Sequence, residues 1–286
     1  MLFVAFDHGI THFDLANNYG PPPGAAEERV GRILDEDLKH YRDELIISSK
    51  AGYRMYPGPY GEWGSRKYLI SSCEASLKRL RLDYVDIFYS HRFDPNTPLE
   101  ETLFALDTLV RQGKALYAGI SSYSGAATAD VIRICENHGW VKPIIHQPNY
   151  SMLNRNIEKD LLPVTARFGL GTIAFCPLAQ GLLTDKYLKS VPEDSRARTG
   201  GFLKEDRITP DLRQKLNALN DLARSRGQSL AQMALAWTLR PQGQTSVTSA
   251  LIGASRPSQI IENVRYQQSP VLSEEELKRI DEILAS

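Results

Sequence analysis

Four side chains able to take part in acid–base chemistry follow three consecutive apolar runs of the sequence. Asp14 ends the first run, Tyr19 lies in the loop behind it, Lys50 ends the next run and His91 follows the third. A carboxylate, a phenol, an ammonium group and an imidazole placed together could deliver a proton to a developing negative charge. Taken singly, each could be a loop acceptor, a packing aromatic, a solvated charge or a satisfied polar residue. Their shared place at the ends of successive runs favours a joint chemical role.

The runs that carry these residues alternate with segments whose apolar residues lie three and four positions apart, as in helices. The pattern predicts seven strands, at residues 11–15, 44–49, 84–89, 115–120, 143–147, 172–175 and 246–252, and helices that include residues 68–80 and 99–110. Strict alternation predicts one parallel α/β domain over residues 1–286. Polar residues follow nearly every strand. This favours a (β/α)8 TIM barrel, whose strand ends meet at one mouth, over a doubly wound sheet.

An eight-stranded barrel needs one strand more than these seven runs supply. Residues 2–9 have the pattern of the end of an amphipathic helix that is closed by Gly9. The sequence therefore predicts that the chain begins inside the first crossover helix, so that the barrel lacks its first strand.

Composition and charge narrow the classes of partner. The 286 residues contain 34 Lys plus Arg and 34 Asp plus Glu, which argues against a nucleic acid or a membrane surface as the partner. The three cysteines have no C-x-x-C spacing and the six histidines have no metal-ligand spacing, so we expect neither a disulfide framework nor a metal. The sequence offers no apolar run of membrane-spanning length and no signal peptide, which favours a cytoplasmic location.

Longer strings of residues resemble the signatures of the aldo-keto reductase superfamily. They are FDLANNYG at 13–20, SSK at 48–50, YSHR at 89–92, GISS at 119–122 and LIGAS at 251–255. The strings NNYGPPPG at 17–24, YPGPY at 56–60 and GSRKY at 64–68 resemble the bacterial L-glyceraldehyde 3-phosphate (methylglyoxal) reductase branch, which is related to potassium-channel β subunits. The resemblance runs through the whole chain and implies an N-terminally truncated member of this superfamily.

The resemblance implies that Asp14, Tyr19, Lys50 and His91 form a catalytic tetrad that reduces small aldehydes to alcohols, of the glyceraldehyde 3-phosphate and methylglyoxal class. Tyr19 would donate the proton, and a nearby ammonium such as Lys50 would favour the phenolate that remains. Asp14 would pair with Lys50, while His91 would orient the carbonyl. Arg92 adjoins His91, and we expect it to contact the anionic part of the substrate.

Hydride must come from a carrier, because no side chain supplies it. The string at 169–174 satisfies G-x-G-x-x-A, but it precedes a strand instead of following one, so we interpret it as a turn. The turn at 253–259 opens a helix after the last strand, where phosphate often binds. From the residues alone, Ser255 could equally cap that helix and Arg256 could face water.

The resemblance implies NADP(H) as the cofactor. Phe175 would stack on the nicotinamide, Ser121 and Gln147 would bond its carboxamide, and Ser255 and Arg256 would hold the 2′-phosphate. The full set of cofactor residues implied is Ser121, Gln147, Phe175, Pro177, Leu178, Gln180, Lys186, Arg196, Gly253, Ser255, Arg256, Gln259, Glu262 and Asn263.

Two other functions stay open on the sequence alone. One is an NADP-binding, redox-sensing regulatory subunit that docks on a partner, as the channel-associated relatives suggest, and the other is an inactive truncated fragment. The joint presence of His91 with Asp14, Tyr19 and Lys50 favours the enzyme. The expected partner is a small aldehyde, and self-association into a homo-oligomer is left open.

Overall fold

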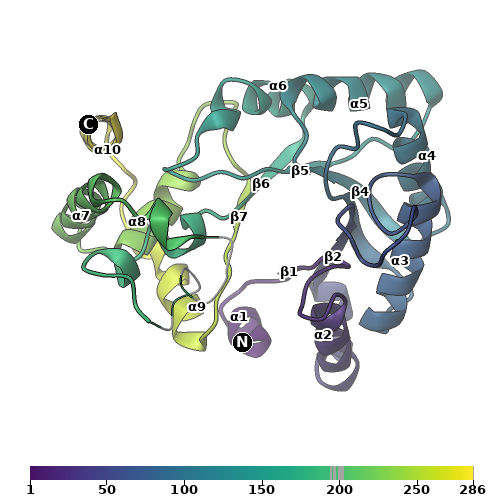
Figure 1. The fold of residues 1–286 in the computed structure, drawn as a ribbon, viewed down its shortest axis with the longest axis horizontal. Helices are drawn as coiled ribbons and strands as arrows, with labels where there is room; N and C mark the ends of the chain where they lie inside the picture. The colour runs from purple at the N-terminus through teal and green to yellow at the C-terminus, as the bar shows by residue number, and fades with distance from the viewer. Residues whose placement is uncertain (194, 196–197, 199–202, 286) are drawn as a thin grey trace. The chain divides into compact units, whose positions relative to one another are not determined.

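Seven parallel strands follow one another in the order β1-β2-β3-β4-β5-β6-β7 (Figure 1). The structure is a computed structural model that describes residues 1–193, 195, 198 and 203–285. The strands are β1 His12–Asp14, β2 Ile46–Ala51, β3 Val85–Ser90, β4 Ala115–Ser121, β5 Ile145–Gln147, β6 Gly171–Phe175 and β7 Ser249–Leu251. All seven predicted strands are confirmed. Their order confirms the predicted (β/α)8 class, with seven of its eight strands present among the described residues.

Helices precede, connect and follow the strands. They are α1 Leu2–Asp7, α2 Ala25–Glu36, α3 Arg66–Leu80, α4 Leu99–Arg111, α5 Gly125–His138, α6 Leu161–Phe168, α7 Pro210–Ser225, α8 Leu230–Thr238, α9 Pro257–Val264 and α10 Glu274–Ala285. Short 3-10 turns cover Lys39–Glu44, Asn156–Glu158, Ala179–Gly181, Asp185–Tyr187, Glu205–Arg207 and Arg265–Gln268. The helices predicted at 2–9, 68–80 and 99–110 are therefore confirmed. None of the helices in the described part of the chain is both long enough and apolar enough to cross a membrane.

Local sequence explains where several helices begin and end. The hydroxyls of Ser65, Ser124 and Thr209 each accept a hydrogen bond from a backbone N–H of the first turn of α3, α5 and α7 respectively, which satisfies a donor left free at a helix start. Gly169 ends α6 at a φ of 67°, and β6 begins two residues later at Gly171. The G-x-G-x-x-A string is thus a helix-to-strand turn, as interpreted from the sequence.

The described chain forms two compact units. The first, here called the β1–β5 unit, contains Gly9–Pro148 and Ile157–Thr172. The second, the α7–α10 unit, contains Met1–His8, Asn149–Asn156 and Ile173–Ser286. The single domain expected from the sequence stays a prediction.

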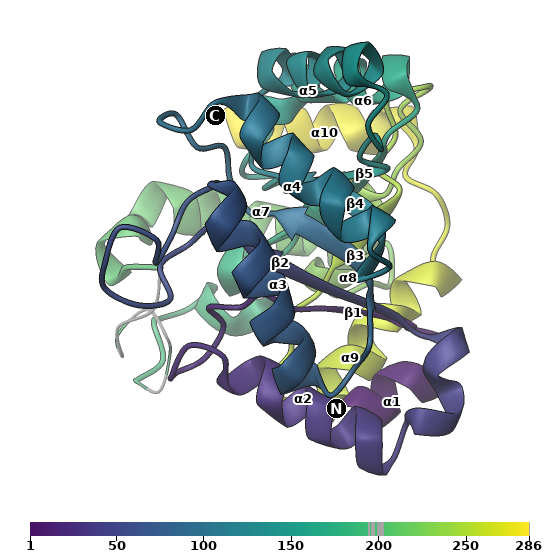
Figure 2. The same ribbon diagram turned by 90° about the vertical axis from the view of Figure 1, so that its right-hand side faces the viewer.

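In the β1–β5 unit the strands bring their carboxyl ends to one edge. Asp14 pairs with Ser48, Lys50 with Tyr89, and Ser121 with Gln147. Helix α2 packs on α3 and α3 packs on α4, and Figure 2 shows α3 and α4 lying across the outer face of β2–β4. Because all these connections are crossovers between parallel strands, polar residues at the strand ends gather at the same edge.

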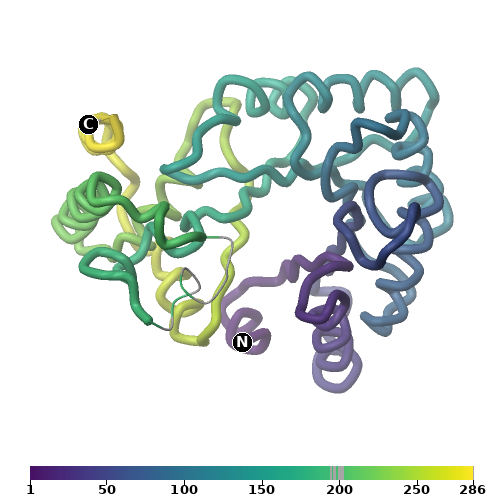
Figure 3. Tube along the Cα trace, viewed as in Figure 1, coloured from purple at the N-terminus to yellow at the C-terminus, as the bar shows by residue number. Residues whose placement is uncertain are grey.

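The α7–α10 unit contains the last three residues of β6, which pair with β7. Helix α8 packs on α7 and α9, and its Trp237 is fully buried. The amino-terminal helix α1 packs on α9, and in Figure 3 the purple start of the chain lies beside the yellow segment of that helix. The first residues of the chain therefore belong to the same unit as its end.

Two ion pairs join α2 to α3, and they differ in burial. The Glu27 carboxylate is fully buried and accepts from Arg79 Nε at 2.7 Å and from the Ser49 hydroxyl. The second pair, Arg81 to Asp35 at 3.0 Å, has side chains that are 49% and 39% exposed. Burial removes water that would otherwise solvate a charge, so only the Glu27 carboxylate depends strongly on its partner.

Replacing Arg79 by Met should lower the free energy of unfolding by about 3–5 kcal/mol, because Glu27 would remain buried without a counter-charge. The matched change Arg81→Met removes the exposed pair between the same helices and should cost no more than about 1 kcal/mol. Urea denaturation of both variants measures the two values. Similar small losses in both would contradict the role given to the buried pair.

Candidate active site

A buried ion pair between β1 and β2 lies at the centre of the site. The Asp14 carboxylate bonds Lys50 Nζ through Oδ2, and Lys50 also donates to the Leu15 carbonyl at 2.6 Å. The Lys50 side chain is 0% exposed and that of Asp14 is 8% exposed. Lys50 and Leu15 meet because backbone bonds from Leu15 and Asn17 continue the β1–β2 ladder beyond the strand.

The two charges stabilise each other against burial. Burial alone would raise the pKa of Asp14, but the charge and hydrogen bond of Lys50, with the bond from Ser48, hold it below its usual value. Burial lowers the pKa of Lys50, and Asp14 and Glu27 offset part of that effect. The arrangement holds an ionised carboxylate and places an ammonium group against it.

Tyr19 and His91 flank this pair in the same unit. The Lys50 nitrogen lies 5.2 Å from the centre of the Tyr19 ring, and the rings of Tyr19 and His91 are 6.0 Å apart, edge to face. Tyr19 is 37% exposed, so a small molecule can reach it, whereas His91 is 8% exposed. The structure thus brings together the four residues that the sequence grouped.

His91 is uncharged at neutral pH. Burial, reinforced by the charge of Lys50, lowers its pKa to about 3, and the opposing effect of Asp14 is smaller. A neutral imidazole can donate one hydrogen bond without bringing a second positive charge beside Lys50. Its Nδ1 is buried and, among the described residues, has no hydrogen-bond partner.

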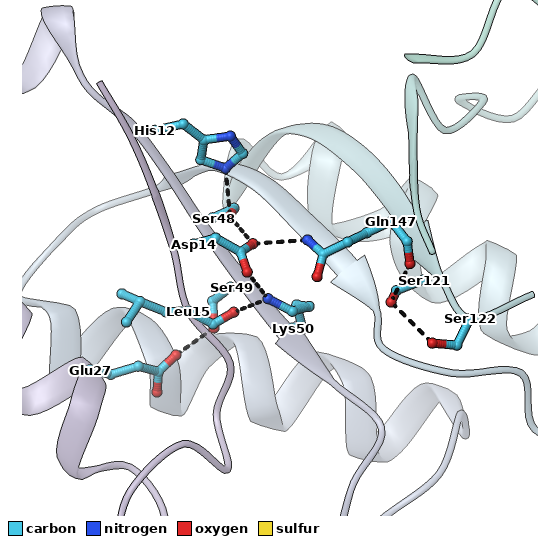
Figure 4. A network of polar contacts seen from close by, with 10 residues as sticks. All are labelled: His12, Asp14, Leu15, Glu27, Ser48, Ser49, Lys50, Ser121, Ser122 and Gln147. Atoms are coloured by element: carbon cyan, nitrogen blue, oxygen red, sulfur yellow. Dashed lines mark hydrogen bonds and ion pairs between the residues drawn. The ribbon is translucent and has the colours of Figure 1, made fainter. Parts of the chain in front are cut away.

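Ser121 and Gln147 end the neighbouring strands β4 and β5. The Ser121 hydroxyl donates to the Gln147 carbonyl at 2.8 Å, and Gln147 Nε2 donates to Asp14 Oδ1 at 3.1 Å. Figure 4 shows Gln147 and Ser48 meeting the same oxygen of Asp14. The residues expected to hold a nicotinamide carboxamide therefore lie beside the expected acid–base group.

Arg92 is fixed more firmly than the sequence suggested. Its guanidinium lies 4.3 Å from the centre of the Tyr53 ring and 3.6 Å from that of Trp63. Its Nε donates to the Gly52 carbonyl at 3.0 Å and its Nη2 to Glu62 at 2.9 Å. Two of its three nitrogens are thus engaged, and a substrate anion would share the guanidinium with Glu62.

Gly52, Tyr53, Glu62 and Trp63 belong to this site although the sequence analysis did not select them. A Cβ on Gly52 would lie 2.9 Å from His91 Cβ, so only glycine permits this approach of the two strand ends. The Tyr53 ring packs edge to face on His91, with centres 4.7 Å apart. A glycine directly after the Ser-Ser-Lys strand is the one signal that could have revealed this contact.

The other predicted cofactor residues lie in the α7–α10 unit. Phe175 ends β6, followed by a loop in which Cys176, Ala179 and Gln180 all have positive φ values between 46° and 60°. Such backbone strain in non-glycine residues clusters at ligand-binding segments. Pro177 is buried, Leu178 is partly buried and Lys186 is exposed, while Arg196 lies outside the described residues.

The turn before α9 contains the remaining group. Gln259 Oε1 accepts from the backbone N–H groups of Ser255 and Arg256, at 2.8 and 3.3 Å, and from the Ser255 hydroxyl at 3.2 Å. The Arg256 side chain and Glu262 are exposed, and the Cβ position of Gly253 faces open space. Asn263 is 4% exposed. Ser255 therefore does not cap α9: Arg256 occupies the N-cap position, and the Ser255 hydroxyl donates to Gln259. The other half of that alternative is met, because the Arg256 side chain is exposed.

Polar atoms that a bound polar molecule could satisfy lie near the ends of the strands. At the ends of β1 and β3, the buried atoms Asn17 Oδ1, Asn18 Oδ1 and His91 Nδ1 find no partner in the described part of the chain, although buried polar atoms are normally satisfied. Such atoms suit a site that a polar molecule completes. Within the described residues no group of His, Cys, Asp and Glu side chains is arranged to hold a metal ion.

Comparisons with known proteins agree with this geometry. The model of the Aldo/keto reductase family matches residues 1–285. The chain is 56% identical over 292 aligned positions to L-glyceraldehyde 3-phosphate reductase of Escherichia coli O157:H7, covering 100% of this chain and 83% of that protein. It is also 36% identical over 285 positions to a probable voltage-gated potassium channel subunit beta of Arabidopsis thaliana, covering 98% of this chain and 85% of that protein.

Acidification from pH 7 to pH 5 should destabilise the protein in part through His91. Its pKa rises from about 3 in the folded state to 6.5 on unfolding, so the unfolded chain takes up the proton first. The free energy of unfolding then falls as the pH drops from about 6.5 towards 3, by about 2 kcal/mol at pH 5.

Urea denaturation of the wild type and His91→Asn at both pH values measures this contribution. The variant should lose about 2 kcal/mol less on acidification, since the other buried histidines are common to both proteins. An equal loss in the two proteins would show that His91 titrates normally in the folded state.

Proposed function

This chain belongs to the aldo/keto reductase family, and we propose that it reduces small aldehydes to alcohols with NADPH and with Tyr19 as the proton donor. Membership makes it an oxidoreductase, and members of the family generally use a nicotinamide cofactor. The observation that carries the proposal is the buried Asp14–Lys50 pair beside Tyr19 and His91.

Each group in the site has its own role in the proposed reduction. NADPH, when bound, supplies the hydride that adds to the carbonyl carbon. Tyr19 gives its phenolic proton to the carbonyl oxygen and later recovers a proton from water. Neutral His91 donates a hydrogen bond that orients the same oxygen.

Lys50 makes proton donation by Tyr19 easier. An ammonium group close to a phenol stabilises the phenolate left after the proton has gone. The contact of 5.2 Å between Lys50 Nζ and the Tyr19 ring centre supports this role. Asp14 keeps Lys50 in place and compensates its buried charge, so that the ammonium stays directed towards one position.

The cofactor residues support NADPH as the nucleotide. Ser121 and Gln147 would hold the nicotinamide carboxamide, with Phe175 against the ring. The strained loop at Pro177, Leu178 and Gln180, with Lys186, would bind the pyrophosphate, and Gly253, Gln259, Glu262 and Asn263 would shape the adenosine end. Arg256 is exposed beside the Ser255 hydroxyl, and such a guanidinium can hold a 2′-phosphate through two bonds.

A small phosphorylated aldehyde is the proposed substrate class. The E. coli relative with 56% identity is named for L-glyceraldehyde 3-phosphate, and methylglyoxal would test a neutral aldehyde of similar size. Arg92 provides a fixed positive charge next to His91, which supports an anionic substituent on the substrate.

A regulatory subunit remains the second candidate, because the Arabidopsis thaliana relative at 36% identity is named a probable voltage-gated potassium channel subunit beta. Such a protein would bind the cofactor and respond to its redox state. The two functions differ in whether aldehyde-dependent oxidation of NADPH continues over many turnovers.

Tyr19→Phe removes only the phenolic oxygen and should lower kcat for aldehyde reduction by about 10²–10⁴-fold, because general acid catalysis is lost. Steady NADPH oxidation with glyceraldehyde 3-phosphate or methylglyoxal measures the rate. Cofactor fluorescence should show NADPH binding unchanged in the variant. NADPH binding by the wild type without any turnover would instead favour the regulatory subunit.

Arg92→Ala should raise KM about tenfold for glyceraldehyde 3-phosphate and change KM for methylglyoxal far less, since only the first carries a phosphate. Glu62→Gln offers the opposite test, because it removes the negative charge that competes for Arg92 and should lower KM for the phosphorylated substrate. If Arg92→Ala affects both aldehydes equally, Arg92 has no role in binding the anion.

A further inference from the structure

We propose that His12 is a positioning residue that fixes the Asp14–Lys50 pair through the Ser48 hydroxyl. The inference rests on the proposed function, because the pair is placed there in the acid–base step. His12 Nε2 lies 2.9 Å from Ser48 Oγ, and Ser48 Oγ lies 2.6 Å from Asp14 Oδ1 (Figure 4).

Strand geometry places these groups at three successive levels of the β1–β2 pair. Residues two apart in a strand face the same side, so His12 shares a face with Asp14, and Ser48 shares one with Lys50. The register pairs Asp14 with Ser48, so these two residues lie opposite each other. His12 lies two residues before Asp14 on β1, and Lys50 lies two residues after Ser48 on β2. The four side chains form a continuous chain of contacts across β1 and β2.

The Ser48 hydroxyl has a single proton, and this fixes which group donates and which accepts in each of these hydrogen bonds. An ionised carboxylate only accepts hydrogen bonds, so the hydroxyl must donate to Asp14. The Ser48 oxygen is then left to accept, and the only partner able to donate in this contact is His12 Nε2–H. His12 must therefore carry its proton on Nε2.

The surroundings of His12 keep it neutral. Burial lowers the pKa of His12, and the charged groups facing it are Asp14 from its own strand, Lys50 from β2 and Asp86 from β3. Asp86 is itself occupied by Arg42 at 2.9 Å and by the backbone N–H of Ile47 at 2.7 Å. A neutral imidazole with Nε2–H is left as the donor to Ser48.

This series of hydrogen bonds restricts the orientation of the Asp14 carboxylate. Its Oδ1 accepts from Ser48 and Gln147, and its Oδ2 bonds Lys50, so both oxygens are held. Donors in a hydrogen-bonded chain polarise one another, which strengthens the bond from Ser48 to the carboxylate. Loss of His12 would free the Ser48 hydroxyl to turn away, and Asp14 would then hold Lys50 less firmly.

A double-mutant cycle separates this role from simple packing. His12→Leu should lower kcat about tenfold while KM for the aldehyde stays within about twofold, because the hydrogen bond that holds the Ser48 hydroxyl against the Asp14 carboxylate is lost. His12→Gln, which keeps a terminal N–H donor, should recover most of the rate. In a Ser48→Ala background, His12→Leu should have no further effect.

Two outcomes of the cycle would overturn the proposal. One is a His12→Leu enzyme as fast as the wild type, and the other is a loss from His12→Leu that persists undiminished in the Ser48→Ala background. Equal losses in the Leu and Gln variants would also contradict a donor role.

The tautomer of His12 can be measured without turnover. Long-range ¹H–¹⁵N NMR of the whole chain at pH 7, with the His12 signals assigned by their absence in His12→Gln, should show the proton on Nε2. In Ser48→Ala the ring should shift towards the Nδ1–H form. A wild-type ring protonated on Nδ1 would overturn the proposal. An Nε2–H ring in a protein that turns over no aldehyde would instead reject the reductase function alone.

Discussion

The buried ion pair of Asp14 and Lys50 is the interaction on which the site depends. Taking two charges out of water costs several kcal/mol per ion, and their attraction offsets this only with good geometry and further hydrogen bonds. Here those bonds come from Ser48, Gln147 and the Leu15 carbonyl. A shift of one residue between β1 and β2 would turn one charge away from the other, so the pair and the strand register depend on each other.

Strand β2 connects this pair to the helices outside the sheet. Successive side chains of a strand point to opposite faces, and Ser48 therefore meets Asp14 whereas Ser49 meets Glu27 of α2. Glu27 in turn pairs with Arg79 of α3. The short Ser-Ser-Lys sequence thus ties the reactive groups to the packing of two helices, which limits the movement of Lys50.

Much of this arrangement could be predicted from the sequence. The alternation of apolar runs with helix-like segments located all seven strands. The position of polar residues at or after the ends of the first three strands was enough to group Asp14, Tyr19, Lys50 and His91. The G-x-G-x-x-A string at Gly169 was rejected correctly as a cofactor motif because motif context depends on the order of strand and helix. Parallel sheets make such inferences possible, since they place every carboxyl end on one edge.

Contacts that depend on register and on side-chain direction could not be predicted. His12 and Ser48 look like ordinary strand residues until the pairing of β1 with β2 aligns them. The engagement of Arg92 by Glu62 and Trp63 depends on a loop whose path has no periodic pattern. The close approach of His91 to Gly52 could likewise not be predicted, because it depends on how the two strand ends approach each other.

The charge state of Lys50 after loss of its partner tests the central claim most directly. We expect a pH titration of the Lys50 ¹⁵Nζ signal in Asp14→Asn to show its ammonium losing the proton at a much lower pH than in the wild type, because a buried cation would have lost its compensating carboxylate. An unchanged titration would contradict the account, since the ammonium of Lys50 would then not depend on Asp14.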